Sequence, residues 1–328
     1  MPSAGKERGP LIVILGPTAS GKTDLAITVA QQFRGEIVSA DSRLVYRGMD
    51  IGAAKPTPTQ RALVPHHLLD VVAPDEVLSL ARYQELAYAA IDDILARGRL
   101  PLLVGGTGQY ISAVIEGWGI PEIPPNPALR ERLEHYASTH GAQALHHWLR
   151  QHDPKAAARI HPHNIRRVIR ALEVCLESGR PISELQRKTP PPYRILQIGL
   201  TRPRAELYAR IDARIAQMMR SGLLEEVRGL LEAGYDRRLP AMSGLGYAQL
   251  SGYLAGEITL EEAVAAIQRA TRDFARRQET WFRKYNRDAH WFQMTENATR
   301  SIIEFIRAWL ESEQSATSER PDLGHQQH

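Results

Sequence analysis

One segment of the chain has the residue types and spacing of a phosphate-binding loop, G-x-x-x-x-G-K-[ST]. It consists of Gly16, Pro17, Thr18, Ala19, Ser20, Gly21, Lys22 and Thr23. In such a loop the glycines let backbone N–H groups point at one anion, and the lysine adds a full positive charge. The last threonine offers its hydroxyl to a phosphate-bound Mg²⁺. The segment therefore predicts binding of a phosphate compound and leaves open which one.

A carboxylate follows the next predicted strand. Asp41 comes directly after residues 36–40, which are mostly apolar. In parallel sheets ligands bind at the carboxyl edge, the same edge that carries the phosphate loop. Asp41 and Lys22 are therefore expected to face one crevice, where an aspartate can hold Mg²⁺ or accept a proton. The alternative role of Asp41 is to cap a turn with Ser42.

A glycine-rich turn, Gly-Gly-Thr-Gly, ends the predicted strand 100–104 at the same edge. Glycines bring backbone close to a ligand, and Thr107 adds a hydroxyl. An ordinary turn is the alternative. Many nucleotide hydrolases have a magnesium-binding aspartate at the end of this strand, where this chain has Gly-Gly-Thr. The chain also lacks the Asn-Lys-x-Asp motif that reads guanine. Both absences argue against a GTPase or motor.

Two arginines four residues apart lie in a predicted helix near residue 210. Arg210 and Arg214 flank an apolar stripe at helical spacing, so both can point at one negative charge. Pairing with Glu206 or Asp212 within the helix is the alternative, and the sequence does not choose between the two arginines.

These residues must be positioned by an α/β core. Strands are expected at 11–15, 36–40, 67–72, 100–104 and 194–200, with helices at 22–32 and 80–97. Proline-rich breaks at 120–127 and 189–192 bracket a helical stretch. The expected organisation is a parallel-sheet core with C-terminal helices (10–117 plus 194–312), a helical insertion domain (118–193) and a disordered tail (313–328).

The bulk composition is that of an ordinary globular protein. The chain has 328 residues, 43% of them hydrophobic, a formal net charge of +4 and one cysteine, Cys175. Its apolar runs are shorter than a membrane span, and its first ten residues lack the apolar centre of a signal peptide. We therefore expect a cytoplasmic protein without a membrane segment.

Basic residues gather in two segments. Residues 269–287 carry seven arginines and lysines against two acids, and residues 155–170 carry five and no acid. Arginines interleaved with aromatic residues in 271–291 can hold phosphates and stack bases. The segments indicate a polyanion longer than a nucleotide, or solvated helix faces with an aromatic core side.

Together these segments resemble the tRNA dimethylallyltransferase (tRNA isopentenyltransferase) family. The resemblance rests on GPTASGKT at 16–23, DSRLVYRGMDIG at 41–52, LVGGTGQY at 103–110 and RRQETWFR at 276–283, and runs from about residue 10 to 290. It implies a P-loop NTPase-like core and transfer of a dimethylallyl group from dimethylallyl diphosphate to N6 of adenine 37, beside the tRNA anticodon.

The resemblance also implies roles for individual residues. Asp41 would be the general base, while Lys22, Thr107 and Arg214 (or Arg210) would stabilise the departing diphosphate, with Mg²⁺ on Thr23. Residues that match the family's contacts to the tRNA anticodon stem-loop are Asp41, Ser42, Arg43, Leu44, Thr107, Arg130, Arg166, Arg167, Arg170, Ser243, Gly246, Tyr247, Arg276, Arg277 and Arg283.

The chain departs from the family pattern at three places. Ala53 replaces a usual threonine, Ser112 a frequent lysine, and Ser243-Gly244 a larger polar residue. Two other functions stay open: an ATP-dependent kinase of a small metabolite, and a non-catalytic RNA-binding protein. The basic segments argue against the first, and the retention of Lys22, Thr23, Asp41 and Thr107 argues against the second. The composition permits a monomer.

Overall fold

The computed structural model describes residues 9–318 and contains a six-stranded parallel sheet in the order β3-β2-β4-β1-β5-β6. The strands are β1 (Pro10–Leu15), β2 (Gly35–Ser39), β3 (His66–His67), β4 (Leu100–Gly105), β5 (Arg194–Thr201) and β6 (His290–Gln293). The central strands β1 and β4 are nearly continuous apolar runs, as strands covered on both faces require. The expected α/β class with a parallel sheet is confirmed.

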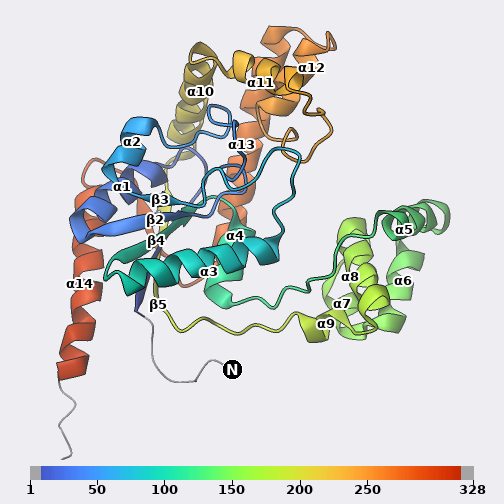
Figure 1. The fold of residues 1–328 in the computed structure, drawn as a ribbon, viewed down its shortest axis with the longest axis horizontal. Helices are drawn as coiled ribbons and strands as arrows, with labels where there is room; N and C mark the ends of the chain where they lie inside the picture. Colours follow the sequence, from blue (N-terminus) through green and yellow to red (C-terminus); the bar gives the residue numbers. More distant parts are fainter. Residues whose placement is uncertain (1–8, 319–328) are drawn as a thin grey trace, which may run out of the picture. The chain divides into compact units, whose positions relative to one another are not determined.

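Helices cover both faces of this sheet (Figure 1). One face packs against α1 (Lys22–Phe33) and α14 (Ala298–Ser318), and the shared core includes Ile12, Leu102 and Ile306. Helix α3 (Leu80–Ala96) lies along the opposite face. Alternate strand residues thus enter different cores. Two short helices, α2 (Pro58–Leu63) and α4 (Gly108–Glu116), complete this part of the chain.

Four helices follow β5 and form a second apolar core. They are α10 (Arg204–Arg220), α11 (Leu223–Glu232), α12 (Tyr247–Leu254) and α13 (Leu260–Tyr285). Val45 and Met49, from the segment after β2, are buried in the same core. The core therefore ties the DSRLVYRGMDIG segment to the C-terminal helices.

Residues 112–191, together with 79–84, make up a separate compact unit; the sequence predicts an insertion at 118–193. Its helices are α5 (Pro127–His140), α6 (Ala142–His152), α7 (Pro154–Arg159), α8 (Ile165–Ser178) and α9 (Ile182–Leu185). They enclose a core of their own that includes Leu133, Leu149 and Leu172. The helices are interrupted at Asp153-Pro154 and at His161-Pro162.

Three expectations about the elements are wrong. The strand expected over 67–72 pairs only at its start, because the chain leaves the sheet and Val72 forms an isolated bridge with Tyr46. Strand β6 lies in a stretch expected to be helical; it is a four-residue edge strand with little burial, so its sequence carries no strand period. Helix α14 continues to Ser318 instead of ending before 313, since extending a helix is easier than starting one. The rest of the expected tail, 319–328, lies outside the described residues.

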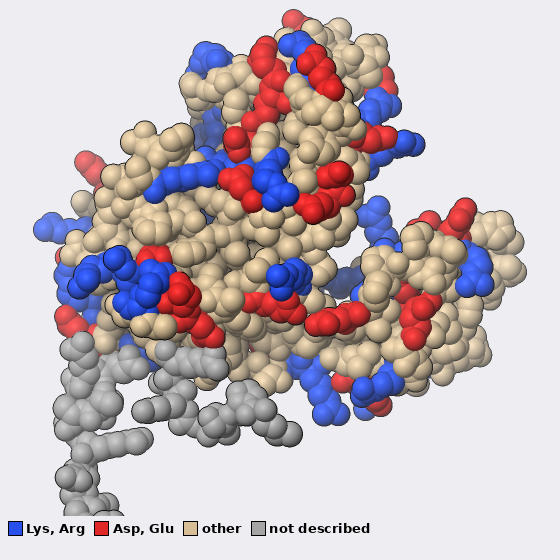
Figure 2. Space-filling view, viewed as in Figure 1, with Lys and Arg blue, Asp and Glu red and all other residues tan. Residues whose placement is uncertain are grey.

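Charges of both signs are interspersed on the face of the molecule seen in Figure 2. Several arginines of the two basic segments have acidic partners: Arg276 pairs with Asp273, and Arg272 with Asp212. Arg166 and Arg167 are exposed, and their side chains make no hydrogen bond or ion pair with any residue from 9 to 318. No helix in this range is long and apolar enough to cross a membrane.

A buried carboxylate organises the helices of residues 112–191. Glu173 of α8 is fully buried and receives hydrogen bonds from Arg130 (2.7 Å, from Nε), Arg170 (2.6 Å) and the backbone N–H of Asn126 (2.8 Å). Burial alone would raise the pKa of Glu173, but these donors lower it to about 2. Arg130 and Arg170, both expected to contact tRNA, therefore hold this unit together.

We predict that Glu173→Gln lowers the free energy of unfolding of this unit by about 1–3 kcal/mol, because two arginines, each about one-third exposed, lose their carboxylate. The pKa of Glu173 in the folded protein lies below its ordinary value of 4.5. In the native protein, Glu173 therefore contributes to the free energy of unfolding above pH 4.5, and this contribution disappears as the pH falls towards 2. Hydrogen exchange of the α8 amides from pH 6 to 3 measures both effects. Glu177→Gln, which removes the charge of an exposed carboxylate that accepts from Asn126, is the control; equal exchange in both variants would contradict the assignment.

Candidate active site

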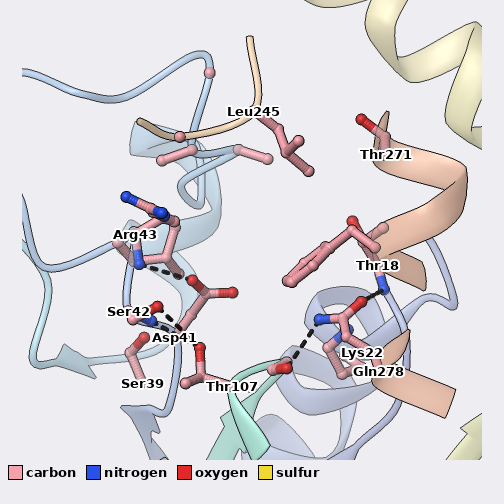
Figure 3. A pocket seen from close by; sticks show the side chains of 18 of the residues that line it. Thr18, Lys22, Ser39, Asp41, Ser42, Arg43, Thr107, Leu245, Thr271 and Gln278 are labelled. Carbon is pink, nitrogen blue, oxygen red and sulfur yellow. Dashed lines mark hydrogen bonds between the residues drawn. The ribbon is translucent and has the colours of Figure 1, made fainter. Parts of the chain in front are cut away.

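A cavity of about 610 Å³ lies at the carboxyl edge of the sheet. The phosphate loop, the ends of β2 and β4, residues 243–247 and the helices α10 and α13 line it. Figure 3 shows the Asp41 carboxylate pointing towards the centre, with Lys22 across from it. As expected, one cavity is lined by Asp41, Thr107 and Lys22.

The phosphate loop connects β1 to the first turn of α1, whose N–H groups have no partner within the helix. Lys22 Nζ donates to the carbonyl oxygens of Gly16 (2.9 Å) and Pro17 (2.7 Å). Burial lowers the pKa of Lys22 to about 8; the Asp41 carboxylate opposes this effect, and the Arg214 guanidinium adds to it. The loop thus presents a concentrated positive field to an anion.

Asp41 is held in place by the turn after β4. Gly105 passes so close to β2 that a Cβ there would lie 2.0 Å from the Ala40 carbonyl oxygen. The close approach allows Thr107 N–H to donate to Ala40 O (3.1 Å), while the Thr107 hydroxyl accepts from Ser42 N–H (2.9 Å). Asp41 Oδ1 then accepts from Arg43 N–H (2.9 Å). Asp41 thus also caps the turn, as the alternative role proposed, yet its carboxylate lines the cavity.

The structure distinguishes the two arginines of α10. Arg210 Nε donates to the Ala19 carbonyl oxygen of the phosphate loop (2.9 Å) and does not line the cavity. Arg214 lines the cavity, and its side chain makes no hydrogen bond or ion pair with any described residue. Desolvation, with a smaller effect from Arg210, lowers the pKa of Arg214, while Asp24 and Asp41 oppose the shift. Arg214 is therefore the arginine available to an anion.

A Mg²⁺ ion would have to arrive with the phosphates. Among the residues that the structure describes, no cluster of three or more His, Cys, Asp or Glu side chains is arranged to hold a metal. Thr23 lines the cavity, and its hydroxyl has no partner within residues 9–318. Because Mg²⁺ keeps several waters and binds substrate phosphates, one hydroxyl and a carboxylate fit such an ion.

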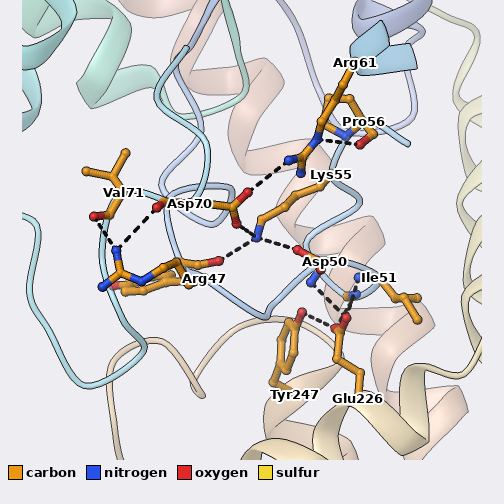
Figure 4. A network of polar contacts seen from close by, with 12 residues as sticks. Arg47, Asp50, Ile51, Lys55, Pro56, Arg61, Asp70, Val71, Glu226 and Tyr247 are labelled. Carbon is orange, nitrogen blue, oxygen red and sulfur yellow. Dashed lines mark hydrogen bonds and ion pairs between the residues drawn. The ribbon is translucent and has the colours of Figure 1, made fainter. Parts of the chain in front are cut away.

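Sequence reasoning missed the residues that support the wall of the cavity (Figure 4). Lys55, whose side chain is 1% exposed, donates to Tyr46 O (2.6 Å) and pairs with Asp50 and Asp70. Glu226 of α11 accepts the backbone N–H groups of residues 50–52 (2.7–3.1 Å) and the Tyr247 hydroxyl (2.6 Å). Burial and the Glu226 carboxylate raise the pKa of Tyr247. Lys55 lies three residues after the DSRLVYRGMDIG segment, on which the family resemblance rests. Nothing in the sequence near Glu226 indicated its role.

The residues expected to contact tRNA fall into several environments. Arg43 donates to Pro240 O (2.9 Å) and contacts Ser243 (3.5 Å), so these two expected sites lie together. Gly246 and Tyr247 line the cavity with Leu44 and Arg277, whereas Arg283 stacks on Trp291, 3.8 Å from the ring centre.

The three departures from the family pattern also differ in environment. Ala53 and Ser243 line the cavity, so both can affect substrate contacts. Ser112 is fully buried with an unpartnered hydroxyl, so it is not a surface contact to phosphate.

Comparison with known proteins places the site in a family. The model of the family "IPP transferase" matches residues 44–285. A tRNA dimethylallyltransferase of Roseiflexus castenholzii is 61% identical over 275 residues, covering 84% of this chain and 90% of that protein. One from Dehalococcoides mccartyi is 48% identical over 301 residues, covering 92% and 93%.

Solved structures agree. The full-length tRNA isopentenylpyrophosphate transferase of Bacillus halodurans is 42% identical with a TM-score of 0.71, covering 96% of this chain and all of that one. A eukaryotic dimethylallyltransferase acting on tRNA is 26% identical with a TM-score of 0.77, covering 97% and 81%. Because a family model and these relatives span most of its length, the chain belongs to the IPP transferase family, together with the tRNA dimethylallyltransferases.

Proposed function

We propose that this protein transfers a dimethylallyl group from dimethylallyl diphosphate to N6 of adenine 37 of tRNA, releasing diphosphate. The observation that carries the proposal is the cavity in which a phosphate loop, an unpaired arginine (Arg214) and a carboxylate (Asp41) face one space. The loop and arginine suit a diphosphate leaving group, and the carboxylate suits removal of a proton from the acceptor amine.

In the reaction, the N6–C1 bond forms as the C1–O bond to diphosphate breaks. The lone pair of an exocyclic adenine amine is delocalised into the ring, so the amine is a weak nucleophile until its proton is taken. Asp41 would accept that proton, because Oδ1 is held by Arg43 N–H while the carboxylate faces the cavity. The capping hydrogen bond fixes the orientation of the base before substrate arrives.

Negative charge builds on the departing diphosphate. Lys22, the loop N–H groups and Arg214 would stabilise it, and the Thr107 hydroxyl would orient the neighbouring turn. A Mg²⁺ ion held by Thr23 and the phosphate oxygens would neutralise further charge when bound. Diphosphate is then a good leaving group without any need for ATP.

The second substrate would be the anticodon stem-loop, whose adenine must leave the base stack to reach Asp41. Arg43, Ser243 and Arg277 surround the cavity and can hold the displaced nucleotide. The exposed Arg166 and Arg167 can hold backbone phosphates elsewhere on the RNA. We place the protein in the cytoplasm, where tRNA is modified, and propose that it acts as a monomer.

The experiment that tests this function is mass spectrometry of nucleosides from unmodified tRNA incubated with the protein, Mg²⁺ and dimethylallyl diphosphate, without ATP. N6-dimethylallyladenosine at position 37 is the expected product. Hydrolysis of ATP stimulated by a small acceptor would support a kinase instead, and RNA binding without any turnover would support a non-catalytic protein.

We predict that Asp41→Ala lowers kcat by 100-fold or more, because the general base is lost. The Kd for tRNA, measured by filter binding, should change less than threefold. Asp75→Ala, which removes an exposed aspartate outside the cavity, should leave both constants unchanged. Turnover retained in Asp41→Ala would eliminate Asp41 as the base.

A second prediction separates the two arginines of α10. Arg214→Ala should lower kcat/KM for dimethylallyl diphosphate by about 100-fold, because it removes a cation from the leaving group. Arg210→Ala should lower it about tenfold or less, because its guanidinium reaches only a loop carbonyl. Arg220→Ala, in the last turn of the same helix, is the control. Steady-state kinetics with equal losses in Arg210→Ala and Arg214→Ala would refute the distinction.

A further inference from the structure

The backbone of the phosphate loop is held by side chains that lie far away in the sequence. Arg202 Nε donates to Ser20 O (3.1 Å), and Arg210 Nε donates to Ala19 O (2.9 Å). On the other side of the loop, Gln278 of α13 accepts the Thr18 N–H at 2.8 Å. Three consecutive loop residues are thus fixed from outside the loop.

Gln278 differs from the two arginines because both ends of its side chain are used. Its Oε1 accepts from Thr18 N–H, and its Nε2 donates to Gly106 O (2.8 Å). The residue is 6% exposed, and the opposite orientation of the amide would leave both bonds unmade. One buried amide therefore joins the phosphate loop to the turn that holds Thr107 (Figure 3).

Two local features of the backbone accompany this link. Ala19 has φ = 62°, in the left-handed region that a non-glycine residue occupies only where its surroundings hold it. On the other side of the link, Gly106 has no room for a side chain, since a Cβ there would lie 2.4 Å from Gln278 Nε2. The amide thus packs closely against the turn, and the loop beside it has a conformation that needs support.

We propose that Gln278 is a positioning residue that holds the phosphate loop in its anion-binding form. It acts through Thr18 and Gly106 and does not react with substrate. The inference rests on the proposed function only in taking the anion to be the diphosphate of the donor. Because Arg277 directly precedes Gln278 on α13 and lines the cavity, one helix would then serve both the RNA and the diphosphate.

The first test measures binding of inorganic diphosphate by calorimetry, which needs neither RNA nor turnover. Gln278→Leu keeps the approximate size of the side chain and removes both hydrogen bonds, so the Kd should rise about tenfold. Gln268→Leu is the matched control, because Gln268 lies on the same helix and its side chain has no hydrogen bond to a described residue. The Kd for tRNA should change less than twofold in both variants.

The second test uses protonation to restore the link. In Gln278→Glu a carboxylate can accept from Thr18 N–H but cannot donate to Gly106 O, and it repels the anion. A protonated carboxyl can do both, as the amide does. The ratio of the variant's Kd for diphosphate to that of the native protein should therefore fall several-fold between pH 8 and pH 5. The same ratio for Gln268→Glu should stay constant.

Three outcomes would overturn the proposal. The first is an unchanged Kd for diphosphate in folded Gln278→Leu. The second is a parallel loss of diphosphate and tRNA binding in that variant, which would indicate general disruption. The third is a Kd ratio for Gln278→Glu that does not respond to pH, which remains measurable if Gln278→Leu does not fold. If the native protein showed no transfer activity, the proposed function would be refuted. The three binding measurements on the Gln278 variants could still be made and would test the role of Gln278 independently.

Discussion

The cavity depends on a backbone contact between the ends of β2 and β4, where no side chain fits. A Cβ on Gly105 would lie 2.0 Å from Ala40 O, so only glycine lets the two strands end so close together. That approach puts Thr107 N–H on Ala40 O and the Thr107 hydroxyl on Ser42 N–H, which in turn fixes the turn carrying Asp41. The sheet thus orients the Asp41 carboxylate before any substrate binds.

Much of this arrangement could be predicted from the sequence, because it is encoded locally. The phosphate loop, Asp41 and Thr107 each follow a buried strand, and the ends of parallel strands must share an edge. Contacts between distant segments could not be predicted: Glu226 with residues 50–52 and Gln278 with Thr18 join positions 174 to 260 residues apart. Nor could periodicity distinguish Arg210 from Arg214, because both lie on the same face of the helix. They differ in their contacts: Arg210 donates to a loop carbonyl, whereas Arg214 lines the cavity.

Counting charges along the sequence overstated the cationic surface, because a count does not show which arginines form ion pairs. Arg130 and Arg170 satisfy the buried Glu173, while Arg276 and Arg272 face aspartates. A buried carboxylate needs several donors, and arginine supplies them in a fixed planar geometry. The cations left for a polyanion are fewer, and they include Arg166 and Arg167 on one compact unit and Arg277 beside the cavity. In the proposed function, the position of these cations would fix how the RNA lies on the protein, and the net charge would matter less.

The supports of the phosphate loop also explain how Lys22 can bind an anion without loss of loop shape. Its ammonium group bonds to Gly16 O and Pro17 O, within the loop that it serves. In the proposed function, the ammonium group would turn towards the diphosphate, and those bonds would weaken. Gln278, Arg210 and Arg202 hold residues 18–20 independently of Lys22, so the loop N–H groups stay aimed at the anion. Burial lowers the pKa of Lys22 to about 8, so a negative partner near its ammonium group would stabilise the charged form.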